Sequence, residues 1–413
     1  MSDSRRRLAP LLAAELISTT GSTMTALALP WLVLTTTGSP TRAGLVAAAE
    51  WIPMALLGIP SGAVAARLGA RRTLMACDAA RAPLVALVPV LYWLDALPFA
   101  ALLALAFLIG AFFPAHFASQ RTILPDLLSE EASDVIRGNV FLQAANRVPV
   151  VAGPALAGVL IGFFGAPAVL LFDAGTYVLA FVLLKLFVPA VRDSASASAP
   201  DESDLLGGVR YLSGDRLLST VTAANAGVEL AMQMIFLGLP ILAFTAYDEQ
   251  VGIAAVLLTV WGAGTLAGMP LAIRWSHHSQ LGVLRLALVW ATLPLWVLAL
   301  HLPPAVLGVA LFVAALANPL VNAPSTSIIT LGVPEALRPK AMLAFVTAMM
   351  TAGGLGLIVT GPAAEALGAH SVLGLAAGMA SACSLGFLFA TRTTRDPAPD
   401  MVAHATTFEE AAQ

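Results

Sequence analysis

The sequence predicts an all-α polytopic membrane protein with twelve transmembrane helices in two six-helix halves. Of its 413 residues, 59% are hydrophobic and 11% are charged, and the mean hydropathy is +0.87. A chain of this length with so few charges cannot cover the surface of an ordinary soluble protein. Apolar runs of spanning length, about 20 residues, recur along it. Their apolar character is continuous rather than alternating, which excludes a transmembrane β-barrel.

Twelve apolar runs can be placed to within a few residues. They cover 9–35, 43–66, 73–94, 97–118, 138–163, 166–189, 217–245, 251–274, 281–301, 304–326, 340–363 and 368–391. A polar, Ser- and Ala-rich stretch of low complexity separates the sixth run from the seventh. We therefore expect an N-terminal bundle over 1–190, a cytoplasmic linker over 191–215 that ends in a short amphipathic helix, a C-terminal bundle over 216–391 and a polar cytoplasmic tail over 392–413.

The basic residues predict that both termini lie in the cytoplasm. With the N-terminus on that side, the arginines and lysines of the turns fall on the same side, and Arg42 is the sole basic residue in an opposite loop. This asymmetry follows the positive-inside rule. Arg5–Arg7 before an apolar run mimics a signal peptide. However, Glu15 interrupts the run and it continues past Trp31, so we interpret it as the first spanning helix.

The two halves resemble copies of each other. Glycines pair at an offset of 203 (Gly153 with Gly356, Gly158 with Gly361, Gly165 with Gly368) and at an offset of 206 (Gly58 with Gly264, Gly62 with Gly268). Small residues are common at membrane helix interfaces, so some matches arise by chance. Two matches at nearly the same offset favour a duplication.

A basic turn, Gly62–Arg72, joins the second and third runs. It resembles the signature loop of the major facilitator superfamily, Gly-x-x-x-Asp-Arg-x-Gly-x-Arg-Arg, with these residues in register: Gly62, Arg67, Gly69, Arg71 and Arg72. Ala66 stands where the family has Asp. The resemblance implies two pseudo-symmetric bundles that transport by alternating access. The arginines are either a topology anchor or part of a gate, and the missing Asp favours the anchor.

Seven ionisable residues fall inside the apolar runs, where each costs roughly 3 kcal/mol at the bilayer centre. They are Glu15, Glu50, Asp78, Arg81, Arg147, Asp173 and Glu229. Asp78 and Arg81 are three residues apart on one helix face, so we expect a salt bridge between them. Asp173 lies close to a helix end, where we expect an interfacial location. We expect Arg81 and Arg147 to act as supporting or gating charges.

The three glutamates have no basic residue within one turn of their own helix. A carboxyl group in a low-dielectric environment without a cationic partner tends to bind a proton, which is the chemistry that a proton-coupled exporter needs. Glu15, Glu50, Glu229 and Asp78 are therefore candidates for proton or substrate coupling. An equally weighted alternative is a carboxyl kept neutral by hydrogen bonds, or paired with Arg147 or Arg81 across the bundle. Polar residues that suggest cavity faces accompany them: Ser18, Thr19, Ser22, Asn225 and Gln233.

The fifth run resembles the antiporter signature of the same superfamily, Gly-x-x-x-Gly-Pro-x-x-Gly-Gly. It matches at Gly153, Pro154 and Gly158 and departs at Pro149 and Ala157. The resemblance implies export rather than import. The alternative is an ordinary bent packing helix, because proline bends a helix and small residues allow close approach. Patterns such as Asp78-Ala-Ala-Arg81 also resemble the macrolide-efflux and enterobactin-exporter group.

These features predict a secondary transporter of the cytoplasmic membrane that exports hydrophobic or amphipathic small molecules in exchange for protons. Alternatives are a dedicated exporter of one metabolite, such as a siderophore or a self-made antibiotic, a proton symporter that imports, and a non-transporting sensor or scaffold. We expect a monomer without enzymatic activity, cofactor, metal site or nucleic-acid partner. No phosphate-binding loop or nucleophile motif occurs, the basic residues form no patch, and His277-His278 fits a solvated turn.

Overall fold

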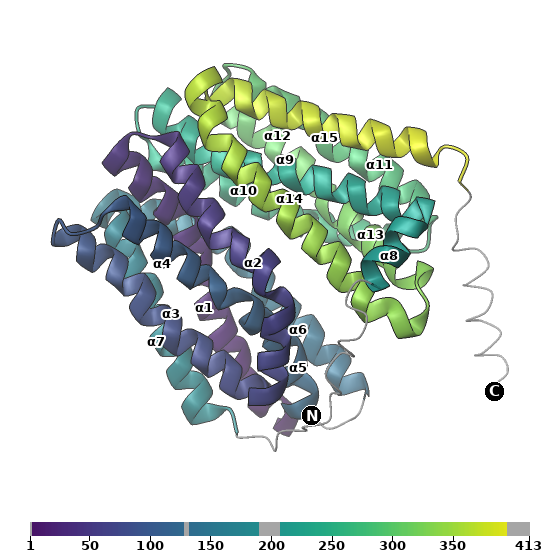
Figure 1. The fold of residues 1–413 in the computed structure, drawn as a ribbon, viewed down its shortest axis with the longest axis horizontal. Coiled ribbons are helices and arrows are strands. Elements are labelled where there is room, and N and C mark those ends of the chain that lie inside the picture. Colours follow the sequence, from purple (N-terminus) through teal and green to yellow (C-terminus); the bar gives the residue numbers. More distant parts are fainter. Residues whose placement is uncertain (1, 128–131, 190–206, 395–413) are drawn as a thin grey trace. The chain divides into compact units, whose positions relative to one another are not determined.

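The computed structural model describes residues 2–127, 132–189 and 207–394, and these residues form helices without strands (Figure 1). The α-helices are α1 Ser2–Thr37, α2 Pro40–Leu68, α3 Ala70–Trp93, α4 Phe99–Ala111, α5 Phe113–Leu127, α6 Ala132–Phe164, α7 Ala166–Phe187, α8 Gly207–Gly214, α9 Arg216–Ala246, α10 Val251–Trp275, α11 Gln280–Thr292, α12 Pro304–Leu316, α13 Asn318–Gly332, α14 Arg338–Leu367 and α15 Ala369–Thr391. Two 3-10 segments, η2 Leu293–Ala299 and η3 Glu335–Leu337, extend α11 and precede α14.

The all-α prediction with about twelve spanning helices is confirmed. Eleven of the described segments are long and apolar enough to cross a membrane. The remaining predicted run, 43–66, lies in α2, a helix of 29 residues. Two predicted runs are each divided into two helices, α4 with α5 and α12 with α13. Pro114 and Pro319 follow these breaks, and proline lacks the amide hydrogen that would continue the helix ladder.

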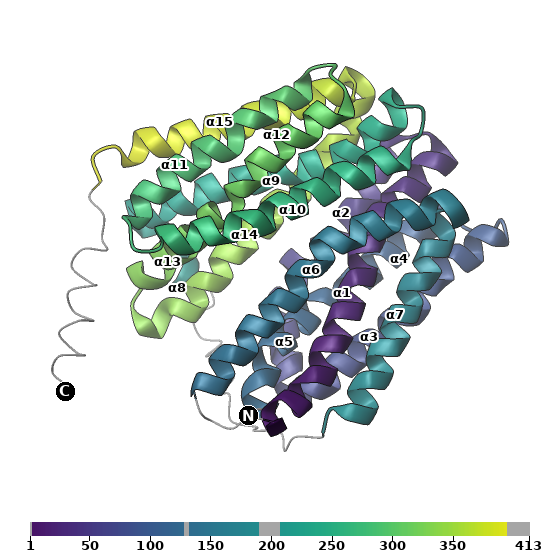
Figure 2. The same ribbon diagram turned by 180° about the vertical axis from the view of Figure 1, so that it is seen from behind.

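By their internal contacts, the helices group into two compact units. The first consists of Met1–Glu202, Phe236–Thr259 and Leu357–Ala369, so it includes α1–α7, the second part of α9, the start of α10 and the end of α14. The second consists of Ser203–Ile235, Val260–Gly356 and His370–Gln413. Within the first unit, α1 packs against both α6 and α7, and Figure 2 shows it running between them.

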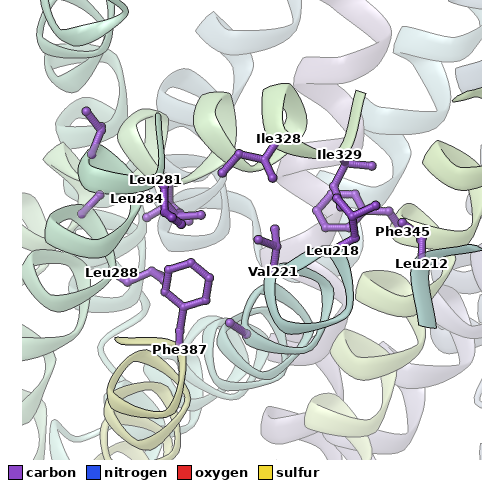
Figure 3. Packing of buried hydrophobic residues seen from close by; sticks show 14 of the residues in the cluster. Leu212, Leu218, Val221, Leu281, Leu284, Leu288, Ile328, Ile329, Phe345 and Phe387 are labelled. Atoms are coloured by element: carbon purple, nitrogen blue, oxygen red, sulfur yellow. The ribbon is translucent and has the colours of Figure 1, made fainter. Parts of the chain in front are cut away.

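Each unit has its own apolar core. In the first, side chains of α1, α3, α5, α6 and α7 meet around Leu11, Leu74 and Leu184. In the second, α9, α11 and α13 pack with Phe345 of α14 and Phe387 of α15 (Figure 3). These apolar cores determine which helix faces pack together, and the polar residues lie on other faces of the same helices.

Two turns have the same backbone geometry at corresponding places. Gly165 separates α6 from α7 with φ of 82°, and Gly368 separates α14 from α15 with φ of 84°. Glycine adopts this left-handed region without the steric penalty that a Cβ atom brings. The pair also matches the duplication seen in the sequence at an offset of 203.

The helix α8 overlaps the short helix that we expected at the end of the linker. Gly208 packs against the backbone of Lys340, and the Tyr211 hydroxyl donates a hydrogen bond of 3.3 Å to the Gly332 carbonyl. The rest of the predicted linker, over 190–206, and most of the predicted tail, over 395–413, lie outside the described residues.

Candidate functional site

Buried polar and ionisable side chains gather in the first unit, on the helices α1, α3, α5 and α7. The group consists of Glu15, Asp78, Arg81, His116, Gln120, Asp173 and Tyr177, and we call it the N-terminal polar cluster. Glu15 and Asp78 are each 1% exposed, and Asp173 is fully buried. Because they are buried, they need hydrogen-bond or charge partners from other protein side chains.

Glu15 of α1 is held by two side chains of α5. The Gln120 amide donates a hydrogen bond to Glu15 Oε2, and His116 Nε2 lies 3.4 Å from the same oxygen. His116 and Gln120 are four residues apart, so they occupy one face of their helix. No arginine or lysine that the structure describes lies within 4.0 Å of the Glu15 carboxyl group. The alternative in which Glu15 pairs with Arg147 or Arg81 is therefore wrong for this conformation.

The predicted salt bridge between Asp78 and Arg81 is wrong. The nearest basic atom to Asp78 is His116 Nδ1, at 3.9 Å from Oδ1, and neither Asp78 oxygen has a hydrogen bond to any residue of the described segments. The Arg81 guanidinium lies over two aromatic rings instead, 4.7 Å from the centre of Tyr177 and 5.9 Å from that of Phe113. Spacing on one helix face allowed the pair, but cation–π contacts turn the arginine away from it.

Asp173 of α7 is not at a solvated interface, as we had expected, but fully buried against α1. Its carboxylate accepts hydrogen bonds from the Thr25 hydroxyl at 2.5 Å and from the Thr176 hydroxyl at 3.1 Å. A Cβ atom at Gly21 would collide with Asp173 and Thr176. The close approach of α1 to α7 at this glycine thus brings Thr25 into hydrogen-bonding range.

The polar stripe of α1 bonds to its neighbouring helices. Ser22 shares a hydrogen bond of 2.8 Å with the Tyr177 hydroxyl of α7, and Thr19 donates one of 3.4 Å to Asn146 of α6. Ser18 is buried. The stripe therefore joins α1 to α6 and α7, and Ser22 helps to position the Tyr177 ring that Arg81 contacts.

Glu50 of α2 and Arg147 of α6 lie outside this hydrogen-bonded set. Both side chains are half-buried, and neither forms an ion pair within 4.0 Å with a residue that the structure describes. The charges that act on Glu50 are those of Arg81 and Asp173. Glu50 is thus an electrostatic neighbour of the cluster, whereas Arg147 is separate from it.

In the second unit, the polar residues of α9 bond in neutral or singly charged pairs. Asn225 donates a hydrogen bond of 3.0 Å to Ser325 of α13, and Gln233 donates one of 2.8 Å to Glu229. Glu229 is half-buried, whereas Asn225 and Gln233 are buried. The predicted polar stripe of α9 is present, and its single carboxyl group is bound to an amide four residues away.

The basic turn divides into one structural arginine and two exposed ones. Gly69, with φ of 80°, separates α2 from α3. Arg71 donates hydrogen bonds to the carbonyls of Leu184, Lys185 and Val188, at 2.8 to 3.1 Å, where α7 ends. Arg67 and Arg72 are exposed, and Gly62 lies within α2. A cation at a helix C-terminus binds carbonyls that have no partner in the helix, so Arg71 anchors α7.

The antiporter-like glycines are positions of close helix contact. A Cβ atom at Gly153 would collide with Thr23 of α1, and one at Gly158 would collide with Ala255 of α10. Thr23 also donates a hydrogen bond of 3.1 Å to the Pro149 carbonyl of α6. Gly153, Pro154 and Gly158 are buried in α6. They shape the bend and contacts of this helix rather than supply a reactive group.

His116 and Gln120 are the site residues that sequence reasoning missed. A signal was present, because His116, Ser119 and Gln120 form a polar face within an otherwise apolar run. The described residues contain no group of three or more His, Cys, Asp or Glu side chains that could hold a metal ion. Within the N-terminal polar cluster, the carboxyl groups of Glu15 and Asp78 lie close enough to the His116 imidazole ring to exchange protons with it.

Comparison with known proteins gives the family. The family model described as Major Facilitator Superfamily matches residues 11–357. The chain belongs to the major facilitator superfamily. It is 28% identical over 376 residues to "Multidrug efflux pump Tap" of Mycolicibacterium fortuitum, which covers 87% of this chain and 90% of that protein. It is 25% identical over 371 residues to "Multidrug efflux pump Tap" of Mycobacterium tuberculosis (strain ATCC 25618 / H37Rv), covering 87% and 88% respectively.

The crystal structure of the nucleoside transporter NupG has the same fold. Its TM-score is 0.77 at 14% sequence identity, with 95% of this chain and 100% of that chain covered. At this identity the likeness concerns the fold alone. Together with the apolar helices, the family membership makes this chain a multi-pass transporter-family protein of a cell membrane.

Proposed function

We propose that this superfamily member exports hydrophobic or amphipathic small molecules from the cytoplasm in exchange for protons, by alternating access. The observation that carries the proposal is Glu15, a fully buried carboxyl group whose partners are His116 and Gln120 rather than an arginine or lysine. A carboxyl group inside a membrane protein that lacks an arginine or lysine partner marks a candidate proton pathway. The relatives named as multidrug efflux pumps support export and a drug-like substrate.

The proposal includes orientation and assembly. The distribution of basic residues supports a cytoplasmic location of both termini. We also propose that the protein is a monomer. The partners are then the transported molecule, protons and the lipid bilayer. Glu50 and Glu229 are secondary proton-binding candidates, because neither has an ion-pair partner within 4.0 Å in the described part of the chain.

The test is transport by purified protein in liposomes with an imposed pH gradient and an interior pH dye. Macrolides, siderophores and cationic dyes such as ethidium serve as the first compounds. Substrate-dependent proton movement is the expected result. Movement of a compound without proton flux would instead make the chain a facilitator or a transporter coupled to another ion.

A second arm replaces the glutamates. The triple variant Glu15→Gln, Glu50→Gln, Glu229→Gln keeps similar side-chain volumes but cannot bind protons there. We expect it to lose export driven by the pH gradient while compound binding remains. Intact gradient-driven export in the triple variant would overturn the role of these carboxyl groups.

A further inference from the structure

His116 lies where two buried carboxyl groups from different helices approach one imidazole ring. Its Nε2 is 3.4 Å from Glu15 Oε2 of α1, and its Nδ1 is 3.9 Å from Asp78 Oδ1 of α3. The residue itself is 6% exposed. Because an imidazole ring can hold a proton at either nitrogen, each nitrogen faces a different acid with which it can exchange one.

We propose that His116 is a proton relay between Glu15 and Asp78, and that binding of the transported molecule drives the transfer. The inference rests on the proposed proton antiport and adds the residue through which the proton moves. It makes the two carboxyl groups parts of a single coupled unit.

The transfer can be written so that protons balance. A protonated Glu15 gives its proton to Nε2 of a neutral ring that carries a proton on Nδ1; the O–H bond breaks, an N–H bond forms, and the ring becomes imidazolium. The Nδ1 proton then passes to the Asp78 carboxylate. The products are an ionised Glu15, a protonated Asp78 and a neutral ring with its proton on Nε2, so the total charge is unchanged up to this point. Asp78 then loses this proton to water, which restores its carboxylate and releases one proton from the protein.

The two ring nitrogens of His116 differ in how closely they approach their acids. Glu15 already contacts both His116 and Gln120. In contrast, His116 Nδ1 and both Asp78 oxygens are buried without a hydrogen bond to any residue in the described segments. The separation of 3.9 Å exceeds the hydrogen-bond range of about 2.7–3.2 Å. A small movement of α3 against α5, or a bridging water molecule, would complete the path, which makes the second transfer dependent on conformation.

The charges that act on the ring come from two helices. They are Glu15 on α1, and Asp78 and Arg81 on α3. Glu50 on α2 interacts electrostatically with Arg81 instead. Among the described residues of α4 there is no titratable group, and Arg147 of α6 forms no ion pair. The His116 ring therefore lies in the electric field of two acids, Glu15 and Asp78, and of one cation, Arg81.

The first test observes the proton on His116 directly. The sequence has 6 histidines. Replacing the other five by glutamine leaves His116 as the sole imidazole; they are His277, His278, His301, His370 and His404. This protein, labelled with nitrogen-15 histidine in lipid nanodiscs, is measured by NMR with and without ethidium, or with whichever compound drives proton flux in liposomes. We expect the compound to move the ring proton from Nδ1 to Nε2, which the two nitrogen-15 signals of His116 report. An unchanged ring state, with the compound shown to bind, would overturn the relay.

The second test measures proton flux in liposomes. The His116→Gln variant can still hydrogen-bond but cannot relay a proton. We expect substrate-driven proton flux to fall at least about 10-fold, with compound binding within about 2-fold of wild type. The control is His301→Gln, because His301 is exposed in the second unit. A wild-type ratio of protons to substrate in the His116 variant would refute the relay alone. Absence of proton flux in the wild type would refute the proposed antiport.

If the His116→Gln variant does not fold, the single-histidine protein decides the question, because it retains the native residue. It also separates the relay from a structural role. A histidine that only packs between α1 and α3 would keep one protonation state whether or not the compound is bound.

Discussion

Two helix crossings, one in each unit, carry different chemistry. In the first, Glu15 of α1 meets His116 and Gln120 of α5. In the second, Asn225 of α9 meets Ser325 of α13 through two hydrogen bonds of 3.0 and 3.2 Å. The first crossing contains a carboxyl group and an imidazole ring, which can exchange protons, whereas the amide and the hydroxyl of the second crossing cannot. We therefore propose that the main proton-coupling group lies in the first unit's crossing, with Glu229 of the second unit as a secondary candidate.

Contacts that hold the helices of each unit together are more similar in the two units than the polar crossings are. Arg71 binds carbonyls at the end of α7, and Arg285 binds the carbonyls of Thr391 and Thr394 at the end of α15. Gly165 and Gly368 form equivalent turns. These groups stabilise both units, so we expect their loss to lower stability without changing proton coupling.

The largest expected effect is a difference in efflux between a glutamate variant of the first unit and one of the second. Glu15→Gln removes the proton-binding group of the first crossing, and Glu229→Gln removes the carboxyl group of α9. We expect gradient-driven efflux from membrane vesicles to fall at least about 100-fold in the first variant. In the Glu229→Gln variant, efflux should fall no more than a few-fold, because Gln233 can still hydrogen-bond to the new amide. Equal losses in both would contradict the placement of the main proton-coupling group in the first unit.

The next effect concerns the two helix anchors. Arg71→Ala leaves carbonyls at the end of α7 without a donor, and Arg285→Ala does the same at the end of α15. We expect each variant to lose about 2 kcal/mol of unfolding free energy, as measured by denaturant titration in detergent. The protons exchanged per substrate should stay at the wild-type value. A changed proton ratio in either variant would show that the anchor also participates in coupling.

A smaller effect tests the neutral crossing of the second unit. Ser325→Ala removes the hydroxyl that bonds to Asn225, and both residues are buried. We expect the free energy of unfolding to fall by about 1 kcal/mol, with no change in the pH profile of transport. Ser384→Ala, at another buried serine of the same unit, is the control, because its hydroxyl bonds only to backbone carbonyls among the described residues. A shifted pH profile for Ser325→Ala would place this crossing in the coupling path.

The smallest effect tests the symmetry of the turns. Gly165→Ala and Gly368→Ala each force a Cβ atom into a left-handed backbone conformation, which costs about 1 kcal/mol. Gly162→Ala is the matched control, because it lies inside α6 with nothing within 4 Å of the added Cβ atom. The midpoint temperature of thermal unfolding should fall by the same amount in the two turn variants. It should not fall in the control. Unequal shifts would show that the two turns differ in surroundings despite their similar φ.

The sequence was sufficient for the fold because the informative pattern is local. Each spanning run is visible in its own residues, and glycines such as Gly165 and Gly368 mark the repeat. The site was predicted only in part. Glu15 was identified from its lack of a nearby basic residue, but its partner His116 lies 101 residues away. Only the packing of α1 against α5 brings them together.

The errors at Asp78, Arg81 and Asp173 have the same origin. A spacing of three residues allows a salt bridge, but it does not reveal the Tyr177 ring that competes for the guanidinium. Position along a helix suggested an interface for Asp173, but not the close approach of α1 at Gly21. Contacts between distant segments decide the partners of buried charges, and those contacts are absent from any one stretch of sequence.

The most direct test of proton coupling in the first unit is a count of protons released when the purified protein binds a transported compound in weakly buffered detergent solution. The account predicts release by the wild type and by the Glu229→Gln variant, and none by the Glu15→Gln variant. Undiminished release from the Glu15→Gln protein, with the compound bound, would contradict it.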